Sequence, residues 1–396
     1  MEIETITICG GGNAAHALIP ILKNNFQGKI NLFLPYKNEA DCFIRLIREK
    51  KSIIAIKGEK KLYGRPDKIS RFAKEVCPDA DLILLLLPAF AHESTLCQIA
   101  SFLKEEAIVG AIPARSGFEY ATLKILKDYR QEKVKIFGLQ TLPWACRIRE
   151  YASKVEILGE KRSVGLAAFP HKITFKLANI LTRLFNLKIE PLPNMLTLSL
   201  ANIGQILHPG IMYGLFKGNE GRRYRKEEIP LFYHGVTKET AQILEEMSNE
   251  ILILTKEIQK KDKYIDLSNV FHVEDWLINS YRDSIQDKRS LQSCLVTNEA
   301  YRGIYAPMRE IGEGYFLPDF QSRYLTEDVP YGLVVTKAIA QLAEVKTFII
   351  DEVILMTSKW MGREYLVNRY LKGKDVKESR IPQNYGINCI EEIMSY

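Results

Sequence analysis

The chain has 396 residues, enough for two domains, and its 46% hydrophobic and 26% charged residues are typical of a soluble globular protein. The net charge of +7 is scattered apart from one cluster, GRRYRK at residues 221–226. No basic stripe with aromatic platforms indicates a nucleic-acid partner, and the longest apolar run, residues 82–87, is too short to span a membrane.

The seven cysteines are widely spaced, odd in number and form no CxxC pair. This usage indicates reduced thiols in a cytoplasmic protein rather than a disulfide framework or a zinc site. A strand-like run begins within a few residues of the N-terminus, so no signal peptide is expected. Five histidines are isolated, without metal-ligand spacing: His16, His92, His171, His234 and His272.

Strand-like and helical segments alternate in the first half of the chain. Strands are predicted at residues 3–9, 30–34, 82–87, 107–112 and 134–139, with helices at residues 13–25, 39–50 and 93–105. A small hairpin is predicted around Gly58, and edge strands at residues 153–158 and 163–169. Continuous apolar strands between helices predict an α/β, Rossmann-type domain with a doubly wound parallel sheet.

After Pro191 and Pro193 the apolar periodicity becomes helical. Helices are predicted at residues 196–207, 238–260, 272–279, 290–297, 331–342 and 349–360. We therefore predict a dinucleotide-binding domain over residues 1–191 and an all-α domain over residues 192–396. There are no internal repeats or low-complexity segments.

A glycine-rich loop lies between the first predicted strand and helix, in the sequence ITICGGGNAAHAL. Gly10 permits a tight turn, Gly12 lets a pyrophosphate approach the main chain, and Ala15 packs the helix on the sheet. The strand–loop–helix context distinguishes this pattern from an ordinary turn and predicts a dinucleotide site. The residues expected to bind the cofactor are Gly10, Gly11, Gly12, Asn13, Ala14 and Ala15.

The sequence leaves NAD and NADP open. An acidic residue that binds the ribose hydroxyls is expected at the end of the second strand, but that strand ends in LPYK at residues 34–37. Glu39 and Asp41 lie beyond it, on the predicted helix, and Lys37 could instead accommodate a 2′-phosphate.

His208 precedes Pro209 in an apolar helix. A lone histidine in such a setting is commonly a core residue, but a reductive dehydrogenase also needs a group that supplies a proton near neutral pH. In QSRYLTEDVPYG, residues 321–332, Asp328 is either a helix cap or a carboxylate that orients a histidine. Arg323 offers a planar fork for a substrate carboxylate, or is a surface charge.

Several stretches together resemble the octopine/nopaline dehydrogenase family, and most closely its invertebrate-type opine dehydrogenases. They run in order along nearly the whole chain, which makes them far more specific than the glycine loop. The stretches are CGGGNAAHAL, LPAFAHE, TLPWACRI, the His208-Pro209 pair, SRYLTEDVPYG and the tail GREYLV, GKDV and PQNYG.

The resemblance implies an enzyme that joins an α-keto acid, typically pyruvate, to the amino group of an amino acid and reduces the imine with NADH. It implies that His208 is the acid–base catalyst and Asp328 its orienting carboxylate. Arg323 would bind the keto-acid carboxylate, and Trp276 and Cys146 match positions on the amine side. Only small-molecule partners are expected, in a monomer or a homodimer.

Two positions depart from the family pattern. Arg115 stands where a glutamine is expected beside the keto acid, and Asn202 replaces an apolar residue near the amine. An added guanidinium suits a carboxylate or sulfonate, so we expect glycine, alanine, β-alanine or taurine in preference to arginine. The alternatives are a hydroxy-acid or sugar-phosphate dehydrogenase, and a non-catalytic NADH-binding protein.

Overall fold

The computed structural model describes residues 2–395, which fall into two compact units. The first unit reaches Leu198 and the second runs from Ser199 to Ser395. The predicted boundary at residue 191 lies at the end of strand β12 (Lys188–Pro191), ahead of Leu198, where the first unit ends. Helix α7 (Met195–Leu200) spans the point at which the chain passes from the first unit to the second.

The first unit is built on an eight-stranded sheet with the order β12-β11-β8-β7-β6-β1-β2-β5. All neighbouring strands are parallel except β11 and β8, which are antiparallel. The predicted Rossmann-type α/β fold is thus confirmed. The strands are β1 (Thr5–Cys9), β2 (Lys29–Phe33), β5 (Lys68–Ser70), β6 (Leu82–Leu85), β7 (Ile108–Ala111), β8 (Lys135–Leu139), β11 (Ser163–Phe169) and β12 (Lys188–Pro191).

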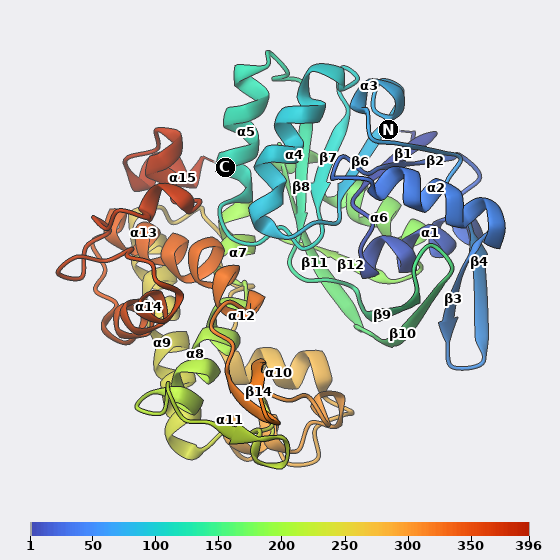
Figure 1. Ribbon diagram of the computed structural model, residues 1–396. Coiled ribbons are helices and arrows are strands. Elements are labelled where there is room, and N and C mark those ends of the chain that lie inside the picture. Colours follow the sequence, from blue (N-terminus) through green and yellow to red (C-terminus); the bar gives the residue numbers. More distant parts are fainter. Residues whose placement is uncertain (1, 396) are drawn as a thin grey trace. The chain divides into compact units, whose positions relative to one another are not determined.

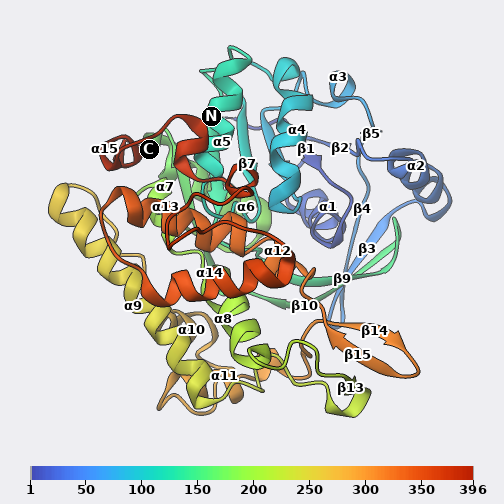
Figure 2. The same cartoon turned by 60° about the vertical axis from the view of Figure 1, so that its left-hand side comes forward.

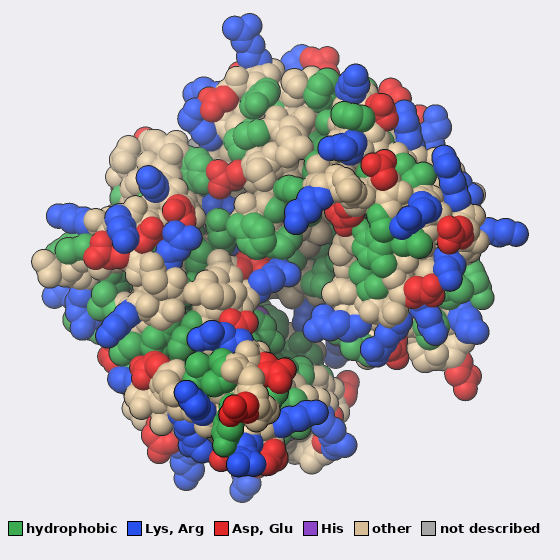
Figure 3. All heavy atoms as spheres, in the orientation of Figure 1, with side chains coloured by type: hydrophobic (Ala, Val, Ile, Leu, Met, Phe, Trp, Pro, Cys, Tyr) green, Lys and Arg blue, Asp and Glu red, His purple; other side chains and the backbone are tan. Residues whose placement is uncertain are grey.

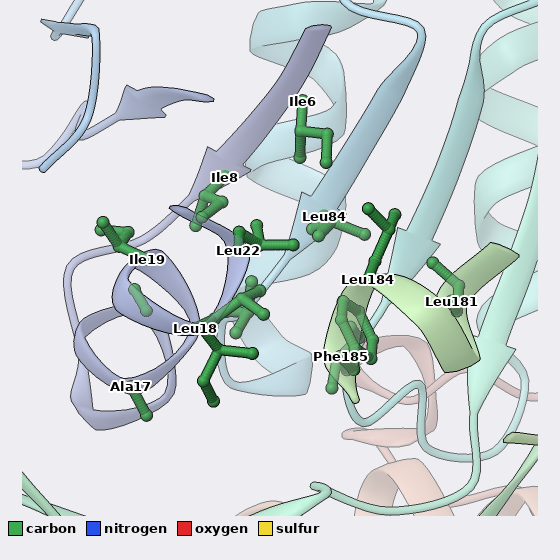
Figure 4. Close-up of a cluster of buried hydrophobic side chains, with 14 of the residues drawn as sticks. Ile6, Ile8, Ala17, Leu18, Ile19, Leu22, Leu84, Leu181, Leu184 and Phe185 are labelled. Carbon is green, nitrogen blue, oxygen red and sulfur yellow. The ribbon is translucent and has the colours of Figure 1, made fainter. Parts of the chain in front are cut away.

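Helices cover both faces of this sheet (Figure 1). Because side chains alternate along a strand, Ile6 and Ile8 of β1 pack on one face with Leu18 and Leu184, while Cys9 faces the other cluster. Figure 4 shows the first cluster between β1, α1 and α6. The helices of this unit are α1 (Asn13–Asn25), α2 (Glu39–Lys50), α3 (Ala73–Val76), α4 (His92–Ile99), α5 (Phe118–Asp128) and α6 (Thr174–Phe185).

A second sheet of four strands has the order β4-β3-β10-β9. It comprises β3 (Ile53–Lys57), β4 (Lys60–Gly64), β9 (Trp144–Glu150) and β10 (Lys154–Glu160). The predicted hairpin around Gly58 is confirmed as the antiparallel pair β3–β4.

The strands predicted at residues 153–158 and 163–169 both form, but the prediction that they are edge strands is wrong. Residues 153–158 belong to β10 of the second sheet, where only alternate residues such as Val155 and Ile157 are buried. Residues 163–169 form β11, which lies between β12 and β8 inside the main sheet. The alternating burial of β10 marks a half-exposed strand, whereas strands covered on both faces are apolar throughout.

The second unit is mainly helical, as predicted, and α8, α9 and α14 pack together in it (Figure 2). The predicted helix at residues 196–207 is split into α7 and α8, and the one at residues 331–342 begins with a π-helical turn, Val329–Leu333. The helices are α8 (Gly204–Phe216), α9 (Lys238–Lys261), α10 (Val273–Tyr281), α11 (Leu291–Val296), α12 (Arg323–Thr326), α13 (Val334–Leu342), α14 (Phe348–Met361) and α15 (Ile390–Met394).

The structure adds a small antiparallel sheet to this unit, in the order β13-β15-β14. Its strands are β13 (Tyr224–Arg225), β14 (Met308–Gly312) and β15 (Tyr315–Pro318). They are short and largely exposed, so they lack the apolar alternation that predicts a strand. The basic cluster at residues 221–226 includes strand β13. On the face of the molecule drawn in Figure 3, basic and acidic side chains are intermixed.

The packing of the main sheet predicts a sharp difference between two glycines. A methyl group at Gly110 on β7 would overlap the buried ring of Phe137, whereas one at Gly159 on β10 would meet no atom of the described residues within 4 Å. Gly110→Ala should destabilise the first unit by about 1–3 kcal/mol through overpacking, or about 2–12 °C in Tm. Gly159→Ala is the matched control and should leave Tm unchanged or slightly higher. Equal Tm values for the two variants in thermal unfolding would contradict this packing.

Candidate active site

The glycine loop joins the end of β1 to the start of α1. Gly10 has φ of 109°, and a Cβ atom there would lie 2.9 Å from the carbonyl oxygen of Leu86. A Cβ atom at Gly12 would have no atom of residues 2–395 within 4 Å, so the main chain is open to an approaching group. The first turn of α1 carries no acidic residue. A loop of this kind at a helix N-terminus suits the pyrophosphate of a dinucleotide.

Two side chains of α1 fix the loop to the second sheet. The Asn13 side-chain oxygen accepts a hydrogen bond from the Ile148 amide at 2.8 Å. His16 donates from Nδ1 to the Gly12 carbonyl at 3.0 Å, and its Nε2 accepts from the Ala152 amide at 2.8 Å. Burial lowers the pKa of His16 to about 4, so the ring stays neutral and keeps both bonds.

Glu39 is the acidic residue that the structure places beside the glycine loop. A Cβ atom at Gly11 would meet both the Glu39 carboxylate and the Tyr151 hydroxyl. Tyr151 donates to Glu39 Oε1 at 2.8 Å, which orients the carboxylate. Lys37, in contrast, is exposed, with its backbone in the left-handed region at φ of 47°.

The remaining predicted residues of the first unit lie on different sheets. Arg115 follows β7 of the main sheet, is half-buried and has φ of 62°. Cys146 is buried on β9 of the second sheet, and burial raises the pKa of its thiol to about 11. The Cys146 thiol is therefore protonated near neutral pH, which argues against a role as a nucleophile.

In the second unit, His208 and Asp328 are in direct contact although 120 residues separate them in the sequence. His208 Nδ1 lies 2.8 Å from Asp328 Oδ2, and the Asp328 side chain is only 1% exposed. Asp328 stands at the start of the π-helical turn, yet its side chain makes no capping hydrogen bond there. The contact fixes the tautomer of the neutral ring, because Nδ1 must carry the proton that it donates to Asp328. Nε2 then carries no proton and faces away from Asp328.

Buried polar contacts join the segment that carries His208 to the segment that carries Asp328. Thr336 on α13 donates to the Gln205 side chain at the start of α8, at 2.6 Å. Gly332 in the π-helical turn packs against Gln205, and a Cβ atom at Gly332 would lie 3.5 Å from the side-chain nitrogen of Asn202. Asn202 is buried at this junction, so the structure places it between the segments that carry His208 and Asp328.

Two tyrosines complete the surroundings of His208. The Tyr324 ring on α12 stacks on the imidazole with 4.1 Å between centroids and an interplanar angle of 13°. The Tyr233 hydroxyl lies 3.1 Å from His208 Nε2. With Asp328 on the opposite edge, the imidazole is held on three sides, and its side chain is still 18% exposed.

The two remaining predicted residues of the second unit are Arg323, the first residue of α12, and Trp276 on α10. Arg323 donates from Nε to Glu327 at 2.8 Å, and the Glu327 side chain is 1% exposed while that of Arg323 is 58% exposed. The buried carboxylate thus orients an accessible guanidinium, directly before Tyr324. Trp276 on α10 is 9% exposed, and its ring lies edge-on to Tyr281 at 6.0 Å.

Sequence reasoning missed Tyr233, Tyr324 and His16. Tyr324 lies within SRYLTEDVPYG, so its neighbours could have drawn attention to it. Tyr233 lies in a connection between β13 and α9, where no motif surrounds it. His16 looks isolated in the sequence because its partners, Gly12 and Ala152, contribute only backbone atoms.

Within residues 2–395, no three His, Cys, Asp or Glu side chains are grouped to hold a metal ion. None of the helices that the structure describes combines the length and apolar character needed to cross a membrane. The seven cysteines are all free thiols.

Comparison with known sequences finds relatives along the whole chain. The family described as NAD/NADP octopine/nopaline dehydrogenase, alpha-helical domain, matches residues 191–361. A tauropine dehydrogenase of Arabella iricolor is 34% identical, over 98% of this chain and 99% of its own length. An opine dehydrogenase of Haliotis discus hannai is 36% identical, over 99% and 98%.

Solved structures give the same result. Octopine dehydrogenase with NADH and L-arginine matches with a TM-score of 0.91 and 30% identity, over 99% of this chain and 98% of that one. The same enzyme with NADH and pyruvate matches with a TM-score of 0.88 and 29% identity, again over 99% and 98%.

The neutral, buried His16 predicts an acid-sensitive first unit. Its pKa is about 4 when folded and about 6.5 when unfolded, so the unfolded chain binds the extra proton first as the pH falls. Stability is fully present above about pH 6.5 and should drop by about 3 kcal/mol between pH 6.5 and 4, or about 6–12 °C in Tm.

His16→Gln should remove this part of the pH dependence, even if Tm is lower throughout. The exposed His171 provides the matched control, and His171→Gln should keep the wild-type pH dependence. An unchanged slope of Tm against pH in His16→Gln would show that His16 does not cause the acid sensitivity.

Proposed function

The chain belongs to the octopine/nopaline dehydrogenase family, and from this premise we propose that it is an NADH-dependent opine dehydrogenase. In the proposed reaction pyruvate condenses with the amino group of an amino acid, and reduction of the imine gives an N-(1-carboxyethyl) amino acid. The observation that carries the proposal is the 2.8 Å contact between His208 and Asp328, since a reductive condensation needs a positioned proton donor.

The glycine loop fits a dinucleotide, with an open main chain at Gly12 and the unoccluded N-terminus of α1 for the pyrophosphate. Glu39 beside Gly11 supports NADH over NADPH, because a carboxylate accepts hydrogen bonds from ribose hydroxyls and repels a 2′-phosphate. The cofactor supplies the hydride when bound. Residues 10–15 and Glu39 would hold and orient it.

His208 manages the protons of the condensation. In its neutral form Nε2 can accept the proton that the substrate ammonium must lose before its nitrogen attacks the keto carbon. The resulting imidazolium is stabilised by Asp328 and can return a proton to the carbinolamine hydroxyl, which leaves as water. One residue thereby serves both proton transfers.

Arg323 is the candidate ligand for the keto-acid carboxylate. Its guanidinium is oriented by buried Glu327 and is accessible, and it presents parallel donors that match a carboxylate. Arg115, in the first unit, stands where the family pattern has a glutamine, and its guanidinium is a further candidate for binding a substrate carboxylate or sulfonate. Trp276 and Cys146 remain candidates for the amine side, each offering a buried apolar surface.

We expect the His208–Asp328 pair to govern turnover. His208→Ala and Asp328→Asn should each lower kcat by about 10²–10⁴-fold while leaving NADH affinity near normal. The measurement is NADH oxidation at 340 nm, with NADH binding followed by fluorescence. His171→Ala is the matched control, because it removes an exposed imidazole from the first unit. Full activity of Asp328→Asn would contradict the pairing and make Glu327 the next candidate.

We expect an amine substrate smaller than arginine or carrying a sulfonate. NADH oxidation should require both pyruvate and one of alanine, glycine, β-alanine or taurine, with kcat/KM above that for arginine. Arg115→Gln should raise KM for the favoured amine or for pyruvate, since it removes a cationic ligand. A clear preference for arginine over all four would contradict this specificity, and oxidation with pyruvate alone would indicate a hydroxy-acid dehydrogenase.

A further inference from the structure

The aromatic ring of Tyr324 lies flat against the imidazole of His208. The two ring centroids are 4.1 Å apart and the interplanar angle is 13°, whereas the rings of Phe232 and Tyr233 are tilted and lie 6.1 and 6.5 Å away. We propose that Tyr324 is a positioning residue that acts through His208, with its ring fixing the plane of the imidazole. This inference rests on the function proposed above and adds a residue to it.

The contact with Asp328 leaves the imidazole free to turn. It anchors the ring at one atom, since Nδ1 lies 2.8 Å from Asp328 Oδ2. The terminal torsion of a histidine side chain is broad, and a hydrogen bond tolerates a range of angles, so a ring anchored in this way can still change its plane. A parallel ring in stacking contact limits that rotation, because the turned imidazole would run into it. The stack thereby sets the direction in which Nε2 points.

The Tyr324 ring is itself held by its neighbours. It lies on α12, which packs against α8, the helix that carries His208. The fully buried ring of Phe232 meets Tyr324 with 4.7 Å between centroids. The amides of Leu325 and Thr326 both donate to the Ser322 carbonyl at 3.0 Å, so the turn that carries Tyr324 is closed by two hydrogen bonds. The ring is therefore a fixed surface rather than a loose cover.

Tyr324 directly follows Arg323, the candidate ligand for the keto-acid carboxylate. In an α-keto acid the carbon that reacts is bonded to the carboxylate carbon, so the carboxylate ligand determines where the reacting carbon lies. One turn of α12 thus carries the group that would place the keto acid and the ring that orients the proton-transferring side chain. Orientation of this kind lowers the barrier to reaction without strengthening substrate binding.

The test compares Tyr324→Leu with Tyr324→Phe in the direction of opine formation. Tyr324→Leu removes the flat face and should lower kcat about three- to tenfold, the factor that corresponds to the loss of one aromatic stack. KM for pyruvate should change little, because Arg323 is retained. Tyr324→Phe keeps the face and should restore most of the wild-type kcat. A normal kcat in Tyr324→Leu, or a kcat equally low in Tyr324→Phe, would overturn the proposal.

Phe320→Leu is the matched control for a purely structural effect. The Phe320 ring stacks on Trp360 with 4.6 Å between centroids and an interplanar angle of 20°, so this variant loses a stack of similar geometry that leaves His208 untouched. It should keep the wild-type kcat even if both leucine variants have a lower Tm. An equal fall of kcat in Phe320→Leu and Tyr324→Leu would show that the effect is one of packing alone.

A second readout does not depend on activity. Protons that lie over an aromatic face are shifted upfield by its ring current, so proton NMR of the imidazole of His208, assigned with His208→Gln, reports the stack. Its ring protons should lie upfield of those of exposed His171 in the wild type and in Tyr324→Phe, and should move downfield in Tyr324→Leu. If Tyr324→Leu does not fold, the wild-type spectrum decides, since shifts like those of His171 would contradict the contact.

These readouts separate the two proposals. An upfield shift that Tyr324→Leu abolishes, without any pyruvate- and amine-dependent NADH oxidation, would support the stack and contradict the proposed reaction. Opine formation with the same kcat in Tyr324→Leu and Phe320→Leu would support the reaction and contradict the role of Tyr324.

Discussion

The second unit is organised around the contact between His208 and Asp328. A carboxylate that is 1% exposed is costly unless it is paired and hydrogen-bonded, and the imidazole provides that partner. The contact forms only if α8 and the segment that begins at Asp328 lie against each other. The buried Gln205–Thr336 hydrogen bond secures this arrangement, and the same contact sets the tautomer that a proton-transferring histidine requires.

In the first unit, hydrogen bonds from two sheets hold the glycine loop in one conformation. The loop is supported from below by the main sheet, where Gly10 donates to the Phe33 carbonyl at 3.0 Å. The second sheet supports it from the side through Asn13 and His16. A loop preorganised by these bonds loses less entropy when it binds a phosphate group. The neutrality of His16 is thus a requirement of the loop, and its acid sensitivity follows.

Much of the fold could be predicted from local patterns. Apolar strands between helices indicated the class of the first unit, and the strand–loop–helix setting of Gly10 and Gly12 located the glycine loop between β1 and α1. The strand pairing of residues 153–169 could not be predicted, because the choice between two sheets depends on long-range hydrogen bonds that leave no local signal. The β13–β15 sheet was missed since short, exposed strands carry no apolar alternation.

In the candidate site, too, local patterns predicted some residues, whereas long-range contacts determine the others. His208 and Asp328 were candidates from their local sequence, but their pairing came from the family resemblance, since their spacing of 120 residues carries no information about contact. The hydroxyl of Tyr233 meets His208 through a turn of the chain that no periodicity predicts. Arg323 was expected as a carboxylate ligand, and the structure adds that Glu327 already binds and orients it. A residue that acts by orienting another side chain can be recognised only when the structure shows the contact between the two.

The identity of the product decides whether this protein forms an opine. Pyruvate, NADH and the amine that best supports NADH oxidation, labelled with ¹⁵N, are incubated with the enzyme, and the products are separated and weighed by mass spectrometry. We expect a secondary amine in which the labelled nitrogen bears a 1-carboxyethyl group, formed in equal amount to the NADH consumed. Lactate as the reduced product, with the label remaining in the free amine, would contradict it.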